Sequence, residues 1–570
     1  MIDFPDGPGR LRRALLRPEQ CWQAWQPDDV AGVIAAAEAA ARDGRWVVGF
    51  VAYEAAAAFD AALQTHAPHP ALPLAAFAAY GPAAEGPPPP GEFHCSPWRP
   101  EIDEARFAAD VAAIREAISD GAYYQSNHTT RLRSAFAGDG GALFAALQAA
   151  QPGGYGIHLD GGEWQILSVS PELFFDWTAA GTLMTRPMKG TAARGGDPTG
   201  DAAAREQLAA SAKDRAENLM IVDLLRNDLS RLAVTGSVRV PALFELEALP
   251  TAWQMTSTVS CQTRPGTTLV DVFRALFPCG SITGAPKVAA MRAIAAREVS
   301  PRGAYCGAIG VIRPGGHASF NVGIRTVTLF PTVGRAECGI GSGITLDSET
   351  AAELAEWGVK TRFLHRASAG FQLLETLRLE DGVYPRGDAH LRRMRAGAEY
   401  FGFPWDDARA AAALAALAEQ HGHGAWRVRL LLDRRGDATA AAYPLEATSA
   451  EARVALATQP IAGDPAFLRH KTTERSAYDA FASPAGVFDT LLWNGRGEIT
   501  EFTRGNVVLE LDGRRVTPPL ACGLLPGVLR AELLARGDVV EAVVRREDLA
   551  RATGLWFVNS LRGQIPARLL

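Results

Sequence analysis

The 570-residue sequence lacks the features of several common protein classes. It has no dense run of lysine and arginine, and its formal net charge is −6. Both observations argue against nucleic acid as its main partner. Its seven cysteines form no Cys-x-x-Cys pair, so we expect neither a zinc site nor disulfides, but reduced thiols in the cytoplasm. No apolar run approaches the ~20 residues of a membrane span, and the first residues lack the pattern of a signal peptide. We therefore expect a cytoplasmic protein with no membrane partner.

Length and local patterns divide the chain into parts. Its length predicts two to four domains. The proline-rich stretch EGPPPPG, which ends at Gly91, cannot continue a helix or a central strand and predicts a linker. Alternating strand and helix patterns then extend to about residue 366, after which the chain restarts with a strand and a turn at Asp381-Gly382. We expect residues 1–90 and 91–368 to form the two parts of a first enzyme, and residues 369–570 a second domain.

Two predicted helices each carry carboxylates on one face. Asp214 and Glu217 are three residues apart, as are Glu353 and Glu356, and Lys360 lies four residues after Glu356. Such spacings place side chains on the same helical face. Two faces that meet across a cleft would provide hard oxygen ligands for Mg²⁺. The spacing alone, however, favours solvated faces with helix-stabilising ion pairs.

Glycine-rich segments lie between these two helices, at GSITGAPK (280–287) and ECGIGSGI (337–344). Glycine lets the backbone approach a ligand and offer N–H groups to an anion. The first segment lacks the spacing of a P-loop, because two residues separate Gly284 from Lys287 and Val288 stands where Ser or Thr is required. The segment therefore predicts a turn and no nucleotide site.

Eight ordered motifs resemble those of the chorismate-utilising family, which includes the anthranilate synthase large subunit, isochorismate synthase and aminodeoxychorismate synthase. They are SPELF (170–174), RPMKGT (186–191), KDRAENLMIVDLLRNDL (213–229), GSITGAPKVAAM (280–291), GAYCGAIG (303–310), NVGIRTV (321–327), GIGSGI (339–344) and ETAAELAEWGVK (349–360). The resemblance implies an α+β fold of antiparallel sheets with flanking helices. It assigns Glu217 and Glu356 to Mg²⁺, with Asp214 and Glu353 beside them. It also implies that chorismate is bound by Thr283, Tyr305, Arg325, the backbone of Gly341 and Gly343, and Lys360.

Lys189, in RPMKGT, is the residue that distinguishes members of this family. Anthranilate and isochorismate synthases typically carry alanine there, so the resemblance favours an aminodeoxychorismate synthase. Lys189 would then add to ring carbon 2 of chorismate and expel the 4-hydroxyl, and ammonia would add at carbon 4 and expel the lysine. Glu172 is the candidate general acid and base. The alternative role for Lys189 is to bind a substrate carboxylate.

One departure from the family pattern concerns Gln254, which stands where many relatives have histidine. Glutamine cannot shuttle a proton as imidazole does. This difference argues against a first enzyme that forms an aromatic product itself.

The last 200 residues or so resemble the fold-type IV enzymes of pyridoxal 5'-phosphate (PLP), which include branched-chain and D-amino acid transaminases and aminodeoxychorismate lyase. The matching motifs are ETLRLEDG (375–382), HLRRM (390–394), RHKTTERSAYDAF (469–481), DTLLWNGRGEITEFTRGNVVLE (489–510), LLPGVLR (524–530) and NSLRG (559–563). The resemblance implies an α/β domain in which Lys471 carries the cofactor and Glu501 pairs with the pyridine nitrogen. It implies that the phosphate is bound by Arg393, by the helix-entering loop of Gly527, Val528 and Leu529, and by Ser560.

Together the two resemblances imply p-aminobenzoate synthesis, because the first enzyme makes what a lyase would consume. Two alternatives stay open: an anthranilate or isochorismate synthase fused to a transaminase, and a C-terminal module that binds or dimerises without PLP. The chain has no Gly-x-Cys-x-Gly nucleophile elbow, so we expect a separate glutamine amidotransferase subunit to supply ammonia. By analogy with fold-type IV enzymes, we expect a homodimer through the C-terminal domain.

Overall fold

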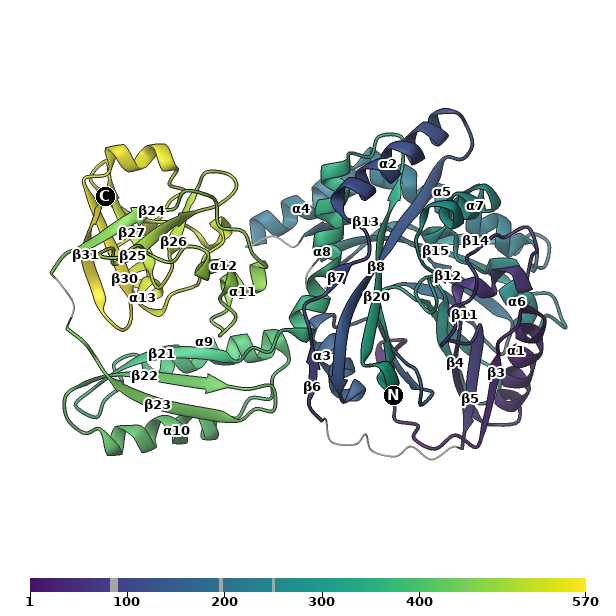
Figure 1. Ribbon diagram of the computed structural model, residues 1–570, viewed down its shortest axis with the longest axis horizontal. Coiled ribbons are helices and arrows are strands. Elements are labelled where there is room, and N and C mark those ends of the chain that lie inside the picture. Colours follow the sequence, from purple (N-terminus) through teal and green to yellow (C-terminus); the bar gives the residue numbers. More distant parts are fainter. Residues whose placement is uncertain (82–90, 194–197, 249–251, 448–449) are drawn as a thin grey trace. The chain divides into compact units, whose positions relative to one another are not determined.

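The computed structural model describes residues 1–81, 91–193, 198–248, 252–447 and 450–570, so nearly all of the predicted proline-rich linker lies outside the described residues. The chain divides into two compact units, Met1–Ser368 and Ala369–Leu570 (Figure 1). Both units combine helices with sheets, which confirms the predicted α+β class. In the described part of the chain, no helix is long and apolar enough to cross a membrane.

The first unit contains two ten-stranded antiparallel sheets. The first sheet has the order β16 (Gly284–Ala285), β8 (Gln125–Gly138), β20 (Arg335–Ile344), β19 (Thr326–Phe330), β10 (Gln165–Ser170), β9 (Tyr155–Asp160), β1 (Ile2–Asp6) and β2 (Gly9–Arg13), and β6 (Phe93–Cys95) and β7 (Arg99–Pro100) also pair with β8. The second has the order β13 (Met188–Ala193), β15 (Ala252–Gln262), β12 (Thr182–Arg186), β11 (Leu173–Trp177), β18 (Ala318–Val322), β17 (Ala308–Ile312), β4 (Trp46–Val51), β5 (Ala75–Tyr80) and β3 (Gln20–Ala24), and β14 (Arg239–Ala248) pairs with β15.

Helices cover the outer faces of these sheets (Figure 1). They are α1 (Pro27–Arg42), α2 (Glu104–Ser119), α3 (Gly140–Ala150), α4 (Pro198–Ala210), α5 (Ala212–Ser230), α6 (Leu269–Leu276), α7 (Lys287–Arg297) and α8 (Thr350–Ser368), with 3₁₀ turns η1 (Tyr53–Ala58), η2 (Gly280–Ile282) and η3 (Pro331–Val333). Buried residues of α1, α5 and α6 pack on the second sheet, and those of α2, α3 and α8 pack on the first.

Strand β4 shows why a continuous apolar run forms a strand in this unit. All six of its residues are buried. Val47 and Val51 belong to the core beneath α1, whereas Val48 and Phe50 face the other sheet, where they join Ile166 of β10. Because successive side chains of a strand point to opposite faces, a sheet covered on both sides requires apolar residues at every position. The apolar run thus forms strand β4, which ends at Val51.

The second unit contains a three-stranded and an eight-stranded sheet. The smaller consists of β21 (Leu373–Glu380), β22 (Ala425–Leu432) and β23 (Ala438–Pro444), and packs with α9 (Gly387–Phe401) and α10 (Asp407–Gln420). The larger has the order β26 (Ile499–Phe502), β25 (Asp489–Trp493), β24 (Ala452–Leu456), β31 (Gly563–Leu569), β30 (Gly554–Asn559), β27 (Asn506–Leu511), β28 (Arg514–Thr517) and β29 (Val540–Glu541), with α11 (Pro465–Arg469), α12 (Ser476–Asp479), α13 (Val528–Arg536), η4 (Leu520–Cys522) and η5 (Arg546–Arg551).

The predicted turn after β21 is confirmed. Asp381 and Gly382 both have positive φ angles, of 48° and 77°, and Glu380 pairs with Val383 across them. Positive φ at both central residues is the geometry of the tight turn that Asp-Gly favours.

Candidate functional site

Lys189 lies in a β-bulge on β13. The register with β15 pairs Met188 with Thr256 and Thr191 with Gln254, so β13 carries one extra residue between these two pairs. Gly190 takes φ 88°, and a Cβ atom there would lie 2.9 Å from the Cβ of Asp214. A bulge re-aims the side chains next to it, and the left-handed backbone at Gly190 favours glycine.

Gln254 holds this bulge in place. Its Nε2 donates to the Gly190 carbonyl at 2.9 Å, and its Oε1 accepts from the Thr191 hydroxyl at 2.8 Å. The glutamine that replaces histidine in this chain therefore uses both ends of its amide to fix the backbone beside Lys189.

Glu172 is the buried carboxyl group that faces Lys189. It lies between β10 and β11 with only 4% of its surface exposed, and its Oε1 has no hydrogen-bond partner. Burial raises the pKa of Glu172, while the Ser281 hydroxyl and the positive charge of Lys189 act in the opposite direction. A buried carboxyl group with a raised pKa beside an amine can hold and release a proton.

The acidic faces of α5 and α8 come within electrostatic range of each other. Burial raises the pKa of Glu217, and the negative charges of Asp214 and Glu356 raise it further. Lys189 lowers it, as does Lys213, whose Nζ is 4.0 Å from Glu217. Among the described residues, no three His, Cys, Asp or Glu side chains are arranged to hold a metal ion. The mutual repulsion of these carboxylates is the kind that a divalent cation relieves.

Two of the predicted site residues are engaged with the protein itself. Glu353 accepts hydrogen bonds from the hydroxyls of Ser342, at 2.5 Å, and Ser348, at 2.7 Å. Thr283 is fully buried, and its hydroxyl donates to the Cys279 carbonyl at 3.1 Å. In this structure Glu353 and Thr283 therefore brace the loops around the site.

Lys360 connects the acidic face of α8 with β20. Its Nζ lies 2.6 Å from Glu356 Oε1 and donates to the Gly341 carbonyl at 2.9 Å. Burial lowers the pKa of Lys360, and the positive charge of Lys189 contributes to this shift. The structure thus brings Lys189 and Lys360 into one electrostatic environment.

The side chain of Gln125, on β8, lies against the backbone of Gly343. A Cβ atom at Gly343 would lie 2.1 Å from the Gln125 Nε2. The Gln125 side chain is 1% exposed, and neither end of its amide has a hydrogen-bond partner. Because buried amides are normally hydrogen-bonded, Gln125 joins the predicted residues as a candidate substrate contact.

Arg325 has the strained backbone of many functional residues. It has a φ of 50°, which is uncommon for a non-glycine residue. Its Nη1 donates to Gln151 Oε1 at 3.2 Å, and its guanidinium lies 5.1 Å from the centre of the Phe363 ring of α8. Burial lowers the pKa of Arg325 to about 10.

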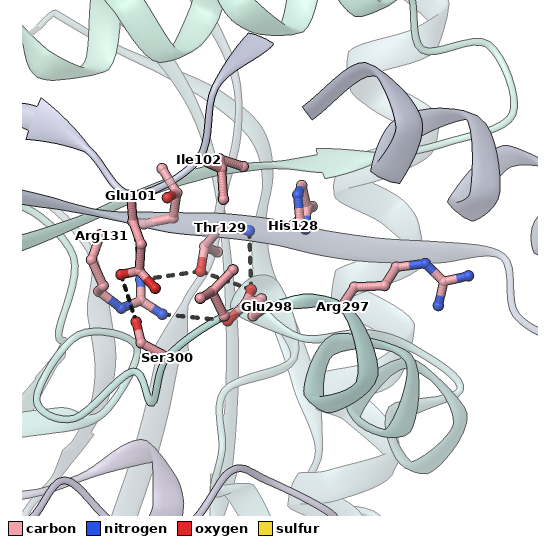
Figure 2. Close-up of a pocket in the computed structure, with 10 residues that line it drawn as sticks. Glu101, Ile102, His128, Thr129, Arg131, Arg297, Glu298 and Ser300 are labelled. Carbon is pink, nitrogen blue, oxygen red and sulfur yellow. Dashed lines mark hydrogen bonds and ion pairs between the residues drawn. The ribbon is translucent and has the colours of Figure 1, made fainter. Parts of the chain in front are cut away.

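Tyr305 rests against a buried ion network. The guanidinium of Arg131 lies 5.1 Å from the centre of the Tyr305 ring. In Figure 2, dashed lines join Glu298 to Thr129 and to Arg131. The Glu298 carboxylate accepts from the Thr129 hydroxyl at 2.7 Å and from Arg302 Nη2 at 2.7 Å. Although burial would raise it, Arg302 and Arg131 keep the pKa of Glu298 below its usual value. This network therefore holds Glu298 and Arg302, the two ends of the segment that precedes Tyr305.

Lys471 of the second unit follows α11 and is attached to β21. Its carbonyl accepts from the Leu374 backbone N–H at 3.0 Å. Burial lowers the pKa of Lys471 to about 8, and the positive charges of Arg393 and Arg475 contribute. An amine with this pKa has a substantial neutral fraction near neutral pH, as a nucleophile or base requires.

Glu501, on β26, is held by three neutral donors. Its Oε1 accepts from the Tyr478 hydroxyl at 2.8 Å and from the Leu525 N–H at 3.2 Å, and its Oε2 accepts from Asn506 Nδ2 at 3.2 Å. Burial raises the pKa of Glu501 to about 7, against the effect of the Tyr478 hydrogen bond. Glu501 can therefore share a proton with a buried ring nitrogen.

The predicted phosphate residues lie at the start of α13, on α9 and directly after β30. Gly527 is its N-cap, and Val528 and Leu529 are its first residues. Arg393 Nη1 donates to the Pro526 carbonyl at 3.0 Å. Ser560 lies within hydrogen-bond distance of His390, on the helix that carries Arg393.

Some residues of these sites were missed by sequence reasoning. They are Gln125, Tyr478, His390, Glu375 and Asn506. For the lysines of these sites, the sequence holds a further signal, because lysine is scarce in this chain. Only five of the 57 lysines and arginines are lysines: Lys189, Lys213, Lys287, Lys360 and Lys471. Three of them fall among the predicted site residues, where an amine differs chemically from a guanidinium.

Comparisons with known proteins divide the chain at the same place. Residues 12–366 match the family described as chorismate binding enzyme, and residues 372–570 match amino-transferase class IV. The class IV match implies PLP as the cofactor of the second unit.

Individual relatives match the first unit. The chain is 41% identical over 272 residues to aminodeoxychorismate synthase component 1 of Klebsiella aerogenes, which covers 48% of this chain and 60% of that protein. It is 33% identical over 366 residues to anthranilate synthase component 1 of Streptomyces coelicolor, which covers 55% of this chain and 71% of that protein. The chain thus spans less than two thirds of the aminodeoxychorismate synthase relative.

A solved structure shares the fold of the first unit. The crystal structure of anthranilate synthase component I from Streptococcus pneumoniae TIGR4 has a TM-score of 0.54 and 23% identity, and covers 64% of this chain and 93% of that one.

Proposed function

The chain belongs to the family of chorismate binding enzymes, and from this premise we propose that it makes p-aminobenzoate in two steps. Met1–Ser368 aminates chorismate to 4-amino-4-deoxychorismate, and Ala369–Leu570 uses PLP to eliminate pyruvate from that product. The observation that carries the proposal is the Lys189 amine on its glycine bulge beside the buried carboxyl group of Glu172.

In the first step, Lys189 is the nucleophile. Its neutral amine adds to ring carbon 2 of chorismate, the double bonds shift, and the 4-hydroxyl leaves as water with a proton from Glu172. Ammonia then adds at carbon 4, the double bonds shift back, and the lysine amine leaves from carbon 2. Arg325, Tyr305, Lys360 and the Gly341–Gly343 backbone would hold the substrate carboxylates.

We infer that Mg²⁺ would bind at the acidic faces of α5 and α8. Glu217 and Glu356, with Asp214 and Glu353 nearby, provide the hard oxygen ligands that Mg²⁺ prefers. Support comes from Glu217, whose pKa is raised first by burial and then further by the neighbouring carboxylates Asp214 and Glu356. The ion would neutralise these carboxylates and bind a carboxylate of chorismate.

PLP fits the second unit. Lys471 would hold it, Glu501 would hydrogen-bond its ring nitrogen, and Arg393, Ser560 and the start of α13, from Gly527 to Leu529, would contact its phosphate. When bound, PLP withdraws electrons from the amino-bearing carbon of the substrate. Lys471 Nζ would remove the proton from that carbon, and aromatisation of the ring would favour the loss of pyruvate.

Ammonia is expected from a partner. We infer a separate glutamine amidotransferase subunit, and the name "component 1" of the Klebsiella aerogenes relative supports this inference. Homodimerisation through residues 369–570 and a cytoplasmic location belong to the same proposal, as does a first unit made of residues 1–90 and 91–368.

An anthranilate synthase is the second candidate for the first unit, and the Streptomyces coelicolor relative favours it. The two candidates differ in product. Anthranilate carries the amino group next to the carboxylate, whereas p-aminobenzoate carries it at the opposite ring position.

The test is to incubate the full chain with chorismate, Mg²⁺ and ammonium, with and without PLP, and to identify the products by mass spectrometry and chromatography against standards. We expect p-aminobenzoate with PLP and 4-amino-4-deoxychorismate without it. The Lys471→Ala variant should accumulate 4-amino-4-deoxychorismate even with PLP. Anthranilate as the product would overturn the first assignment, and 4-amino-4-deoxychorismate from the native chain saturated with PLP would overturn the second.

A further inference from the structure

Glu375, on β21, is a buried carboxylate outside the predicted set of site residues. It is 1% exposed, as is His390 on α9. Although burial alone would raise it, Arg393 and His390 lower the pKa of Glu375 to about 2. Glu375 is therefore ionised near neutral pH and accepts hydrogen bonds only.

Both carboxylate oxygens of Glu375 accept hydrogen bonds from Arg393. The Arg393 Nε donates to Glu375 Oε1 at 2.7 Å, and its Nη2 donates to Glu375 Oε2 at 2.6 Å. Such a two-point contact sets the plane of the guanidinium. The remaining nitrogen, Nη1, donates to the Pro526 carbonyl at 3.0 Å, one residue before the N-cap of α13.

Glu375 is also connected to Ser560, through a contact with His390. The His390 Nδ1 lies 2.6 Å from Glu375 Oε2, and its Nε2 lies 2.8 Å from the Ser560 hydroxyl. Because Glu375 cannot donate, Nδ1 must carry the hydrogen. Nε2 and the Ser560 hydroxyl then share one hydrogen bond, which fixes the position of the Ser560 oxygen.

We propose that Glu375 and His390 are positioning residues that aim Arg393 and Ser560 at one phosphate monoester, the phosphate of PLP. The inference rests on the proposed cofactor site. One carboxylate thus orients two donors that come from α9 and from the loop after β30, residues far apart in the sequence.

The test compares PLP with pyridoxal, which has the same ring and aldehyde but no phosphate. The full chain is freed of cofactor and titrated with each, and the dissociation constant is read from the visible absorbance of the bound form. We expect Glu375→Gln to weaken PLP at least about tenfold, because charge-assisted hydrogen bonds are lost. Pyridoxal binding should weaken much less, because Glu375 acts on that ligand only through its charge effect on the pKa of Lys471. The matched control is Glu380→Gln, the same change at an exposed residue on the same strand, which should alter neither.

A second pair of variants keeps the test decisive if Glu375→Gln does not fold. Ser560→Ala should weaken PLP about three- to tenfold and leave pyridoxal unchanged. In the Ser560→Ala background, His390→Ala should add less than it costs alone, because both act through one hydroxyl. Equal losses of affinity for PLP and pyridoxal, or unchanged PLP binding in Glu375→Gln or Ser560→Ala, would overturn the positioning role proposed for Glu375 and His390. A native chain that binds no PLP would instead reject the proposed cofactor site.

Discussion

The carboxylates of the two candidate sites are held in opposite ways. In the second unit, Glu501 and Glu375 accept hydrogen bonds at both of their oxygens, from tyrosine, asparagine, histidine, arginine and backbone donors. In the first unit, Glu172 has a buried oxygen without a partner, and the Glu217 anion is destabilised by burial and, to a smaller extent, by two neighbouring acids. The second site is organised around donors for an anion, whereas the first concentrates negative charge around an amine.

This difference indicates what each site requires. A buried carboxyl group whose two oxygens already accept hydrogen bonds needs no further polar partner. Crowded or unpartnered carboxyl groups either take up a proton or bind a cation. We therefore expect the first unit to depend on a proton at Glu172 and a divalent cation at Glu217, and the second to depend on the geometry of its donors.

Among the changes that test this comparison, replacing the Glu172 carboxyl group should have the largest effect. The Glu172→Gln variant should form 4-amino-4-deoxychorismate about 10²–10⁴-fold more slowly, the usual contribution of a general acid. Because the protonated form acts and its pKa is raised, the native rate should fall as the pH rises through that pKa. The measurement is the initial rate against pH, with saturating ammonia.

The control for this variant is Asp223→Asn, on the exposed side of α5. It should keep the native rate and the native pH profile. A Glu172→Gln variant within twofold of the native rate would remove Glu172 from the mechanism.

Breaking the buried network beside Tyr305 should have the next largest effect. Glu298→Gln leaves Arg302 and Arg131 without their carboxylate, and breaking a buried pair costs about 3–5 kcal/mol of unfolding free energy. Denaturant unfolding of the full chain measures it, and we expect only the transition of the first unit to shift. Loss of the exposed Asp223–Arg226 pair, in Asp223→Asn, should cost less than about 1 kcal/mol. Equal losses for the two variants would contradict the role given to the network.

Magnesium should give a smaller but selective effect. At a concentration about 100 times its dissociation constant, Mg²⁺ should stabilise the first unit by about 2.7 kcal/mol, and chelation should remove this stabilisation. In Glu217→Gln the magnesium response should largely disappear. Thermal unfolding with Mg²⁺ or EDTA measures it, and visible absorbance of bound PLP reports the second unit, which should not respond. A full magnesium response in Glu217→Gln would place the ion elsewhere.

The elements that depend on local patterns were predictable from the sequence. The helix over KDRAENLMIVDLLRNDL is confirmed as α5, and the helix over ETAAELAEWGVK as α8, because apolar residues recur at helical spacing in both. The turn at Asp381-Gly382 follows from the backbone preference of that dipeptide.

The contacts that complete each site were not predictable. The bulge at Lys189 depends on the register between β13 and β15, which local sequence does not specify. The hydrogen bonds from Glu375 through His390 to Ser560 join three separate segments. Such contacts arise from long-range packing, which local sequence patterns do not specify.

The central claim is that the Lys189 amine attacks chorismate, and intact-protein mass spectrometry tests it most directly. With chorismate and Mg²⁺ but no ammonia, the native chain should gain the mass of chorismate minus water, and peptide mapping should place the adduct on Lys189. The Lys189→Arg variant keeps a positive charge but no nucleophilic amine, so it should form no adduct and lose amination activity at least about 10³-fold. Amination by Lys189→Arg at the native rate would contradict the account.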